Sequence, residues 1–351
     1  MKFGIWYDFR NPTPWRRPWR QLYESLLEQI VWADSLGFDS VWLSEHHFTD
    51  EGYLPSLFPM LAALASRTSR MRLGTAVLLA PLHHPLRLAE DSAVIDQISG
   101  GRLELGLGPG YRPEEFVSLG IPRNQRGART DETIEILKAA WTGLPFTHHG
   151  HHFVFDDVVV NPPPLQQPHP PLWIGGSSQS SARRAARFDC NFMPDSGAPP
   201  TVYDAYIQGI GNETRHRTPH RIGTNRVIYV CEDPEEGWRD VGPHYLYVFN
   251  RYREWFAAAG DFPEWGGKLQ SSNDLSRELH WVGTPEMVTA SIRALQNRVP
   301  IDTLIFWAHP PGIDIEKSSR SLELFSQYVL PQFAERQEAT ASPSKPVGES
   351  S

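Results

Sequence analysis

Met71–Gly108 decides the fold class of this chain, and its sequence is MRLGTAVLLAPLHHPLRLAEDSAVIDQISGGRLELGLG. The first part, Met71–Leu79, is rich in apolar residues and is typical of a buried strand. Pro85–Ile98 follows with a proline in its first turn and apolar side chains at helical spacing. Leu103–Leu107 is a second short strand. A strand, a helix and another strand in this order predict two parallel strands joined by a helical crossover.

The same alternation extends in both directions from this unit. Strands are predicted at Phe3–Tyr7, Ser40–Leu43, Met71–Leu79, Leu103–Leu107, Leu172–Ile174, Asn191–Met193, Arg226–Val230 and Thr303–Trp307. Helices are predicted at Trp19–Leu36, Pro55–Ser66, Pro85–Ile98, Arg129–Trp141, Ser178–Arg187, Thr201–Ile210, Pro285–Gln296 and Ile315–Phe333. Eight such repeats predict an α/β chain closed into a (β/α)8 TIM barrel, with residues 1–335 as one domain.

An open, doubly wound sheet is the alternative architecture. It would be favoured by a glycine-rich dinucleotide fingerprint directly after the first strand. The residues found there are Trp6-Tyr7-Asp8-Phe9 instead. We therefore prefer the barrel.

Three segments depart from the even repeat. Thr147–Pro164 is rich in histidine and then in proline, and it predicts a small β-hairpin around Gly150. Gly260–Glu278 is an insertion between the seventh and eighth strands, and loops of that length are lids or disordered segments. Residues 336–351 are small and polar, which predicts a disordered tail.

Composition argues against several classes of partner. The 351 residues carry a formal net charge of −8 without a basic stripe, so a nucleic acid is not expected. The two cysteines fit a reducing compartment. Asp8 and Arg10 interrupt the apolar run that a signal peptide needs, and no run reaches the roughly 18 apolar residues of a membrane span. We expect a soluble, cytoplasmic protein.

In a barrel of this kind, function collects at the C-terminal ends of the strands. The second predicted strand delivers Glu45, His46 and His47 to that end. A histidine in this position can act as a general base near neutral pH, and an adjacent carboxylate can orient it. Alternatively, these residues are polar groups bonded to neighbouring loops, and spacing alone leaves both interpretations open.

Two glycine-rich runs follow other strands. Gly175–Ser181 leads from the fifth strand into a helix, where free N–H groups and serine hydroxyls suit a phosphate. An ordinary serine N-cap is the alternative. Gly106–Tyr111 ends the fourth strand, and its glycines either leave room for a flat ring or phosphate or simply form the turn.

The histidine-rich tract His148–His152 is the most obvious candidate for a metal site. Its histidines flank the predicted hairpin turn, and no cysteine or aspartate partners converge on it in the sequence. We therefore predict no metal site. A metal-dependent hydrolase is disfavoured because the strand ends lack enough spaced histidine and carboxylate ligands.

In combination, these runs resemble the bacterial-luciferase-like flavin-dependent monooxygenases. The resemblance extends from Met1 to about Phe333. It is carried by SEHHF (Ser44–Phe48), the run Leu73–Tyr111, RTDETIEILKAAWTG (Arg129–Gly143), NPPPLQQPHPPLWIGGSS (Asn161–Ser178), WVGTPEMV (Trp281–Val288) and RSLELFSQYVLPQF (Arg320–Phe333).

The resemblance implies a barrel that holds reduced FMN and reacts it with dioxygen to oxygenate a small organic substrate such as an aldehyde or ketone. It implies that His46 is the catalytic histidine and that Glu45 supports it. A non-prolyl cis peptide at Ala76–Val77 would carry the flavin ring. The other cofactor-binding residues would be Gly108, Gly110, Tyr111, Arg112, Arg129, Gly175, Gly176, Ser177, Ser178 and Ser181.

The sequence departs from the family's pattern at the phosphate end of the cofactor. Luciferase has an arginine at the position of Pro109 and an acidic residue at that of Ser177. A cation for the phosphate must then come from elsewhere, and the candidates are Arg112, Arg126 and Arg129. Because no dinucleotide fingerprint is present, a separate reductase would supply the reduced flavin. The resemblance also leads us to expect a homodimer.

Two alternatives remain within the same fold. One is an oxidoreductase that uses the deazaflavin coenzyme and transfers hydride without oxygen. The other is a non-catalytic flavin-binding subunit, against which the presence of both Glu45 and His46 argues. The substrate is not encoded in these motifs, and the loops at Gly260–Glu278 and His83–His84 are the expected places for specificity.

Overall fold

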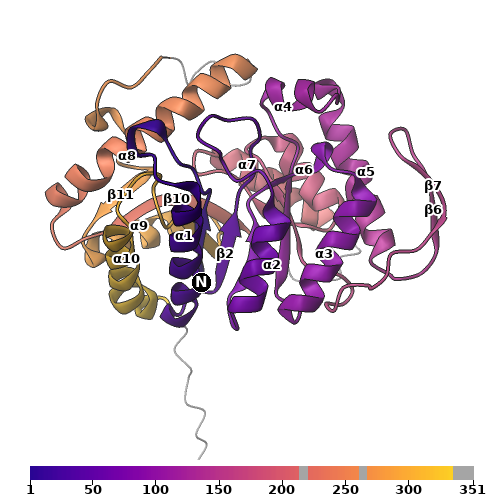
Figure 1. Cartoon of the computed structure of the whole chain (residues 1–351), viewed down its shortest axis with the longest axis horizontal. Helices are drawn as coiled ribbons and strands as arrows, with labels where there is room; N and C mark the ends of the chain where they lie inside the picture. The colour runs from indigo at the N-terminus through magenta and orange to yellow at the C-terminus, as the bar shows by residue number, and fades with distance from the viewer. Residues whose placement is uncertain (213–219, 261–266, 335–351) are drawn as a thin grey trace, which may run out of the picture.

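A computed structural model describes residues 1–212, 220–260 and 267–334. Its centre is a curled sheet of parallel strands surrounded by helices (Figure 1). The strand order is β11-β10-β12-β1-β2-β3-β5-β8-β9, and β4 pairs with β5. The bounds are β1 Lys2–Tyr7, β2 Ser40–Leu43, β3 Arg72–Thr75, β4 Leu78–Leu79, β5 Leu103–Gly108, β8 Leu172–Gly175, β9 Asn191–Met193, β10 Gly223–Val230, β11 His280–Gly283 and β12 Thr303–Trp307.

The last strand of this order, β9, approaches the start of β10, the second strand of the order. Phe192 in β9 forms an isolated parallel bridge with Ile222, the residue before β10. The first half of β10 pairs with β12, and its second half, Val227–Val230, pairs with β11. Each strand segment predicted from the sequence contains or overlaps an observed strand, so the parallel α/β organisation is confirmed.

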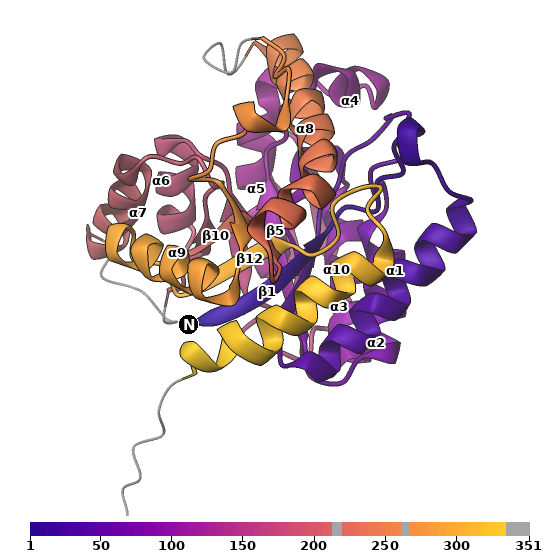
Figure 2. The ribbon, with the colours of Figure 1, turned by 90° about the vertical axis from the view of Figure 1, so that its left-hand side faces the viewer.

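Helices connect the strands and cover the outside of the sheet. They are α1 Trp19–Ala33, α2 Leu57–Arg67, α3 Pro85–Ser99, α4 Pro113–Ser118, α5 Arg126–Ala140, α6 Gln179–Arg187, α7 Pro200–Asn212, α8 Pro234–Ala259, α9 Pro285–Arg298 and α10 Ile315–Leu324. The sequence did not predict α4 and α8. Figure 2 shows both near the end of the sheet toward which β1 points. Within the described ranges, every helix is too short or too polar to cross a bilayer.

Burial on both faces explains the apolar strands. All residues of β2 are buried, as is usual for a parallel strand with side chains packed on either side. Inside the curl, Trp42 and Trp173 meet edge to face with ring centroids 5.6 Å apart, and Met193 and Ile305 join them. The larger core lies between the sheet and the helices.

The irregular segments agree with the sequence in part. The hairpin is confirmed as β6 Phe146–His149 and β7 Val154–Val158, which pair antiparallel. The insertion Gly260–Glu278 includes residues 261–266, which lie outside the described residues, and so does the predicted tail 336–351. After the insertion, β11 and α9 precede β12.

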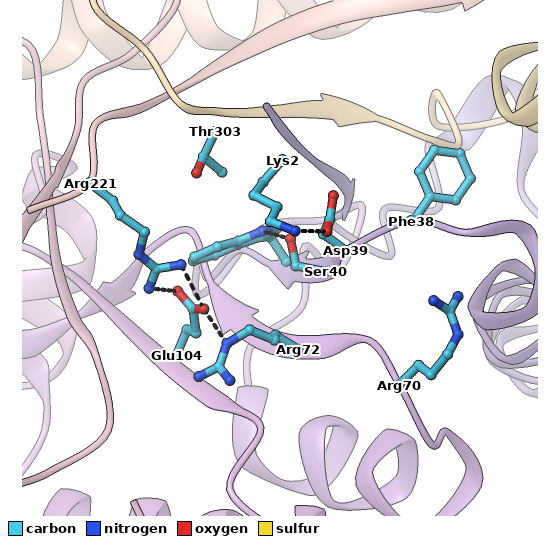
Figure 3. Close-up of a pocket in the computed structure, with 10 residues that line it drawn as sticks. Lys2, Phe38, Asp39, Ser40, Arg70, Arg72, Glu104, Arg221 and Thr303 are labelled. Atoms are coloured by element: carbon cyan, nitrogen blue, oxygen red, sulfur yellow. Dashed lines mark hydrogen bonds and ion pairs between the residues drawn. The ribbon is translucent and has the colours of Figure 1, made fainter. Parts of the chain in front are cut away.

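Charged side chains close the amino-terminal ends of the strands. A cavity of about 270 Å³ opens there (Figure 3). The buried carboxylate of Glu104 accepts hydrogen bonds from Arg72 and from both terminal nitrogens of Arg221, the latter at 3.1 and 2.7 Å. Lys2 pairs with Asp39 at 3.0 Å. These ion pairs hold the strand starts together, at the end opposite the one where such folds carry catalytic groups.

Candidate active site

The loop after β2 brings His46 into an aromatic pocket at the carboxyl end of the sheet. The imidazole is 6% exposed. It meets Tyr53 and Tyr111 edge to face, with ring centroids 4.7 and 5.4 Å away. Trp255 of α8 lies 5.2 Å away on another side. The walls around this ring are therefore aromatic and come from three separate segments.

A buried glutamate fixes the orientation of this imidazole. Nδ1 of His46 lies 2.8 Å from Oε1 of Glu115, a residue of α4 with no exposed surface. The same oxygen accepts hydrogen bonds from the backbone N–H of His47 at 2.9 Å and from Arg112 at 3.3 Å. An ionised carboxylate can only accept, so the His46 proton lies on Nδ1. Nε2 is then left to face the Tyr111 hydroxyl, 3.4 Å away.

Burial favours the neutral form of His46. Loss of hydration lowers the pKa of His46, although the hydrogen bond and charge of Glu115 raise it in part. A neutral imidazole with its proton on Nδ1 has an unshared electron pair on Nε2. That nitrogen can accept a proton or a hydrogen bond from a reacting group.

The hydrogen bonds of Glu45, which the sequence analysis expected to support His46, go to other groups. Oε1 of Glu45 accepts from Nε2 of His47 at 2.6 Å and from Nε2 of His83 at 2.7 Å. Oε2 accepts from the backbone N–H of Leu79 at 2.7 Å. Burial alone would raise the pKa of Glu45, but the charge of His83 and the two histidine hydrogen bonds lower it to about 2. Glu45 therefore binds His47 and His83, whereas Glu115 binds His46.

The segment between β3 and β4 has the conformation that the resemblance implied. The Ala76–Val77 peptide bond is cis. The backbone N–H of Ala76 donates to the carbonyl of Leu43 at 2.7 Å, so this segment lies beside the end of β2. A Cβ added at Gly108 would lie 2.4 Å from one methyl of Val77, and one added at Gly175 would lie 2.5 Å from the other. These two glycines make room for the cis segment.

The run after β8 forms the N-terminus of α6. Ser178 is the N-cap, and its hydroxyl accepts from the backbone N–H of Ser181 at 3.1 Å. Gly176 has φ of 124°, and a Cβ there would meet the Ser181 hydroxyl oxygen at 2.6 Å. The Ser177 hydroxyl accepts from the backbone N–H of Asp195 at 3.2 Å. The serine N-cap is confirmed, and it leaves the phosphate prediction standing because a helix N-terminus presents N–H groups in either case.

The candidate arginines Arg112 and Arg129 lie in different surroundings. Arg112 lies in the His46 pocket, where it donates to the backbone carbonyl of His47 at 2.8 Å and its guanidinium lies 4.5 Å from the Trp255 ring centroid. Arg129 lies on α5, 4.7 Å over the Phe153 ring of the hairpin. Gly110, with φ of 72°, forms the turn that leads into the Tyr111 and Arg112 pair.

A buried ionic cluster beneath the pocket was not foreseen. Arg10 and Glu51 form an ion pair at 2.7 Å, and neither side chain is exposed. The Arg10 guanidinium lies 5.1 Å from the ring centroids of both Tyr53 and Trp255. Burial raises the pKa of the neighbouring Asp8 to about 7, although the Arg10 charge lowers it in part.

Comparison with known proteins places the chain among enzymes. Residues 1–300 match the model of the luciferase-like monooxygenase family. The oxygenase component of the flavin-dependent trigonelline monooxygenase of Acinetobacter baylyi is 29% identical, over 97% of this chain and 99% of its own. The structure of monooxygenase RslO1 from Streptomyces bottropensis has a TM-score of 0.83 at 30% identity, over 95% of this chain and 100% of its own.

More distant matches are also informative. The oxygenating constituent of 3,6-diketocamphane monooxygenase from Pseudomonas putida, solved with FMN, has a TM-score of 0.79 at 24% identity, over 95% of this chain and 98% of its own. An F420-dependent glucose-6-phosphate dehydrogenase from Microbacterium testaceum is 34% identical, but only over 51% of this chain and 54% of its own.

The parallel α/β fold and the named relatives define the class first: an α/β oxidoreductase. Within that class, the chain belongs to the luciferase-like monooxygenase family. The resemblance found in the sequence is confirmed.

The donors around this end of the sheet suit a flavin. Nε of Arg112 and Nε1 of Trp307 are buried, and neither has a protein partner among the described residues. Both atoms are hydrogen-bond donors, and a flavin ring offers carbonyl and ring-nitrogen atoms that can accept from them. The residues present therefore fit the cofactor of the family.

Proposed function

We propose that this chain is a monooxygenase that binds reduced FMN and uses dioxygen to oxygenate a small organic substrate, such as an aldehyde or ketone. The observation that carries the proposal is the His46–Glu115 pair, which presents an imidazole Nε2 in the loop after β2. The cis segment Ala76–Val77 lies beside the end of the same strand. The oxygenase component named among the relatives supports a two-component system, in which a separate reductase supplies the reduced flavin.

In the proposed complex, Ala76 and Val77 support the ring, and Gly108 and Gly175 make room for the Val77 side chain. The phosphate binds at the N-terminus of α6, where Gly176, Ser177, Ser178 and Ser181 lie. Arg129 is the proposed cation for the phosphate. Bound reduced FMN supplies the electrons that activate dioxygen for insertion into the substrate.

The protein side of the mechanism rests on His46. Its Nε2 accepts a proton or hydrogen bond from the reacting group, and Glu115 keeps the ring in the tautomer that allows this. Tyr53, Tyr111 and Trp255 exclude water from this nitrogen, which strengthens each electrostatic contact made there. Glu115 is a positioning residue because it acts through His46.

Three further expectations belong to this proposal. The bridge between Phe192 and Ile222 would close β1, β2, β3, β5, β8, β9, β10 and β12 into an eight-stranded barrel. The active form would be a homodimer, as the family resemblance implies. The protein would work in the cytoplasm, where a reductase can deliver reduced flavin.

A deazaflavin-dependent oxidoreductase is the second candidate. It is favoured by the F420-dependent relative and by the absence of the family's arginine at Pro109. Both cofactors would use the same strand ends, so the difference lies in binding and in the response to oxygen.

An anaerobic titration separates the two candidates. The purified chain is titrated with reduced FMN and, separately, with reduced F420, and oxygen consumption is followed when air is admitted. The proposal expects tighter binding of reduced FMN by more than about tenfold, with oxygen uptake that an accepted substrate couples to product. Tighter binding of F420, without substrate-coupled oxygen uptake, would establish the second candidate instead.

A matched variant tests the phosphate end. Gly176→Ala adds a Cβ where the Ser181 hydroxyl is only 2.6 Å away and where φ is 124°. We expect it to weaken FMN binding and to leave the binding of riboflavin, which has no phosphate, nearly unchanged. If Gly176→Ala weakened the binding of FMN and of riboflavin equally, the phosphate would not bind at this end of α6.

A further inference from the structure

Glu45, His47 and His83 form a second group of polar side chains, which the proposed mechanism does not use. Nε2 of both histidines points at the same carboxylate oxygen, Oε1 of Glu45, at 2.6 and 2.7 Å. One oxygen and two nitrogens, one from each residue, all lie within 4.8 Å of one another. Among the residues that the structure describes, this is the group in which three such atoms converge.

The two carboxylate oxygens of Glu45 have different partners: one accepts from the backbone, and the other accepts from both histidines. The backbone N–H of Leu79 donates to Oε2 of Glu45 at 2.7 Å, which fixes the plane of the carboxylate. Metal-binding carboxylates are typically oriented by a hydrogen bond of this kind. Glu45 is buried, whereas the side chains of His47 and His83 are 15% and 29% exposed. The group is therefore anchored on one side and open to solvent on the other.

Two imidazole nitrogens and one carboxylate oxygen are ligands for transition metals. Zn²⁺ and Fe²⁺ sites use this set and keep further positions for water. Mg²⁺ and Ca²⁺ prefer oxygen ligands alone. With metal–ligand distances of about 2.0–2.2 Å, the ligand atoms must separate to roughly 3 Å. His83 lies in a turn before α3 and is partly exposed, so its ring can move outward by that amount.

We propose that Glu45, His47 and His83 bind one divalent transition-metal ion of the zinc type, with the remaining coordination positions filled by water. The ion replaces the two histidine-to-carboxylate hydrogen bonds and ties the loop after β2 to the start of α3. The inference is independent of the cofactor, because no group of the proposed flavin site takes part. It departs from the sequence-based prediction of no metal site.

The test is metal binding by the full chain after removal of metals with EDTA. Zn²⁺ is titrated in by calorimetry, and Co²⁺ is titrated in with its visible ligand-field absorption as the readout. We expect one equivalent to bind to the wild type and to raise the melting temperature. His83→Ala and Glu45→Gln are expected to weaken binding by more than about tenfold and to abolish the cobalt absorption.

Two controls distinguish this site from adventitious binding. His84→Ala changes the neighbouring histidine, which packs against Phe153 outside the group, and it should bind the ion as the wild type does. His149→Ala removes the exposed His149–Asp156 pair of the hairpin and should also leave the single equivalent in place. Circular dichroism checks that each variant folds. If Glu45→Gln does not fold, the binding measured for His83→Ala alone decides between the proposal and its failure.

The proposal fails on either of two results. One is the absence of saturable Zn²⁺ binding by the wild type. The other is binding that persists in His83→Ala or disappears in His149→Ala. Flavin titrations play no part in these outcomes, so failure here leaves the proposed function untouched.

Discussion

The two sides of the loop after β2 differ in their access to water. On the sealed side, His46 lies against Tyr53, Tyr111 and Trp255, and its partner Glu115 has no exposed surface. On the open side, Glu45 holds His47 and His83, whose rings reach solvent. Consecutive residues of one short loop thus enter two separate networks. Tertiary contacts, and not adjacency in the sequence, decide which glutamate bonds which histidine.

The difference extends below the pocket. The sealed side rests on Arg10, Glu51 and Asp8, all of them buried, and is covered by aromatic residues of α8. Charges in such surroundings interact strongly because little water screens them. The open side is wetter, which suits a hydrogen-bond network or an ion more than chemistry that must exclude water. The following predictions test this contrast, beginning with the largest expected effect.

Removal of the His46 imidazole should lower kcat more than any other change. His46→Ala is expected to lower kcat by roughly 10²–10⁴-fold, the range for losing a general acid–base group, while affinity for reduced FMN changes little. The measurement is substrate-coupled oxygen consumption, with binding followed by anaerobic titration. His47→Ala is the matched change on the open side and should lose less than about tenfold. Equal losses in the two variants would contradict the contrast.

The buried acid of the sealed side should make stability depend on pH. The pKa of Asp8 is raised by burial to about 7 in the folded protein, so the folded state binds more protons than the unfolded state between about pH 4 and 7. Stability from this group is present at low pH and is lost as the pH rises through 7. The loss amounts to roughly 2–3 kcal/mol between about pH 5 and pH 8.

The check on Asp8 is the free energy of unfolding of the wild type and Asp8→Asn at both pH values. The asparagine variant cannot ionise, so its stability relative to the wild type should improve by that amount as the pH rises. A difference that stays constant with pH would show that Asp8 ionises normally.

Loss of the orienting carboxylate should cost less than loss of the imidazole. Glu115→Gln keeps the shape of the side chain but removes its charge and its fixed acceptor character. We expect kcat to fall roughly 10- to 100-fold, about 1.4–2.7 kcal/mol, with KM nearly unchanged. Glu45→Gln is the matched change on the open side and should affect kcat much less. The opposite order would restore Glu45 as the partner of His46.

The smallest effect is expected at Phe48, and it concerns the free energy of unfolding. Phe48 has φ of 56° and is 59% exposed, and the left-handed region costs a residue such as phenylalanine about 1–2 kcal/mol. Phe48→Asn should therefore raise the free energy of unfolding by up to about 1 kcal/mol, measured by urea denaturation. A loss of stability would mean that the Phe48 ring makes contacts that outweigh the backbone strain.

The parts predicted from the sequence are those that local patterns encode. Short apolar runs predicted the strands because parallel strands are buried on both faces. The helical segment predicted at Trp19–Leu36 does end at Leu36, and the next residue, Gly37, has φ of 98°. The cis bond at Ala76–Val77 came from the family resemblance and not from the residues themselves.

The missed parts depend on contacts between distant segments. Glu115 lies 69 residues from His46, on a helix of only six residues, so no local pattern reports their pairing. The long helix α8 escaped prediction because Gly237, Gly242 and Pro243 interrupt its pattern, yet its Trp255 and Tyr252 form part of the pocket wall. Tertiary packing overrides such local signals.

The tautomer of His46 is the most direct test of the account. With ¹⁵N-labelled histidine, long-range proton–nitrogen NMR correlations report which ring nitrogen carries the proton. We predict that His46 is neutral with its proton on Nδ1, and that Glu115→Gln perturbs this signal while Glu45→Gln leaves it in place. A proton on Nε2, or a signal that responds to Glu45→Gln and not to Glu115→Gln, would contradict the account.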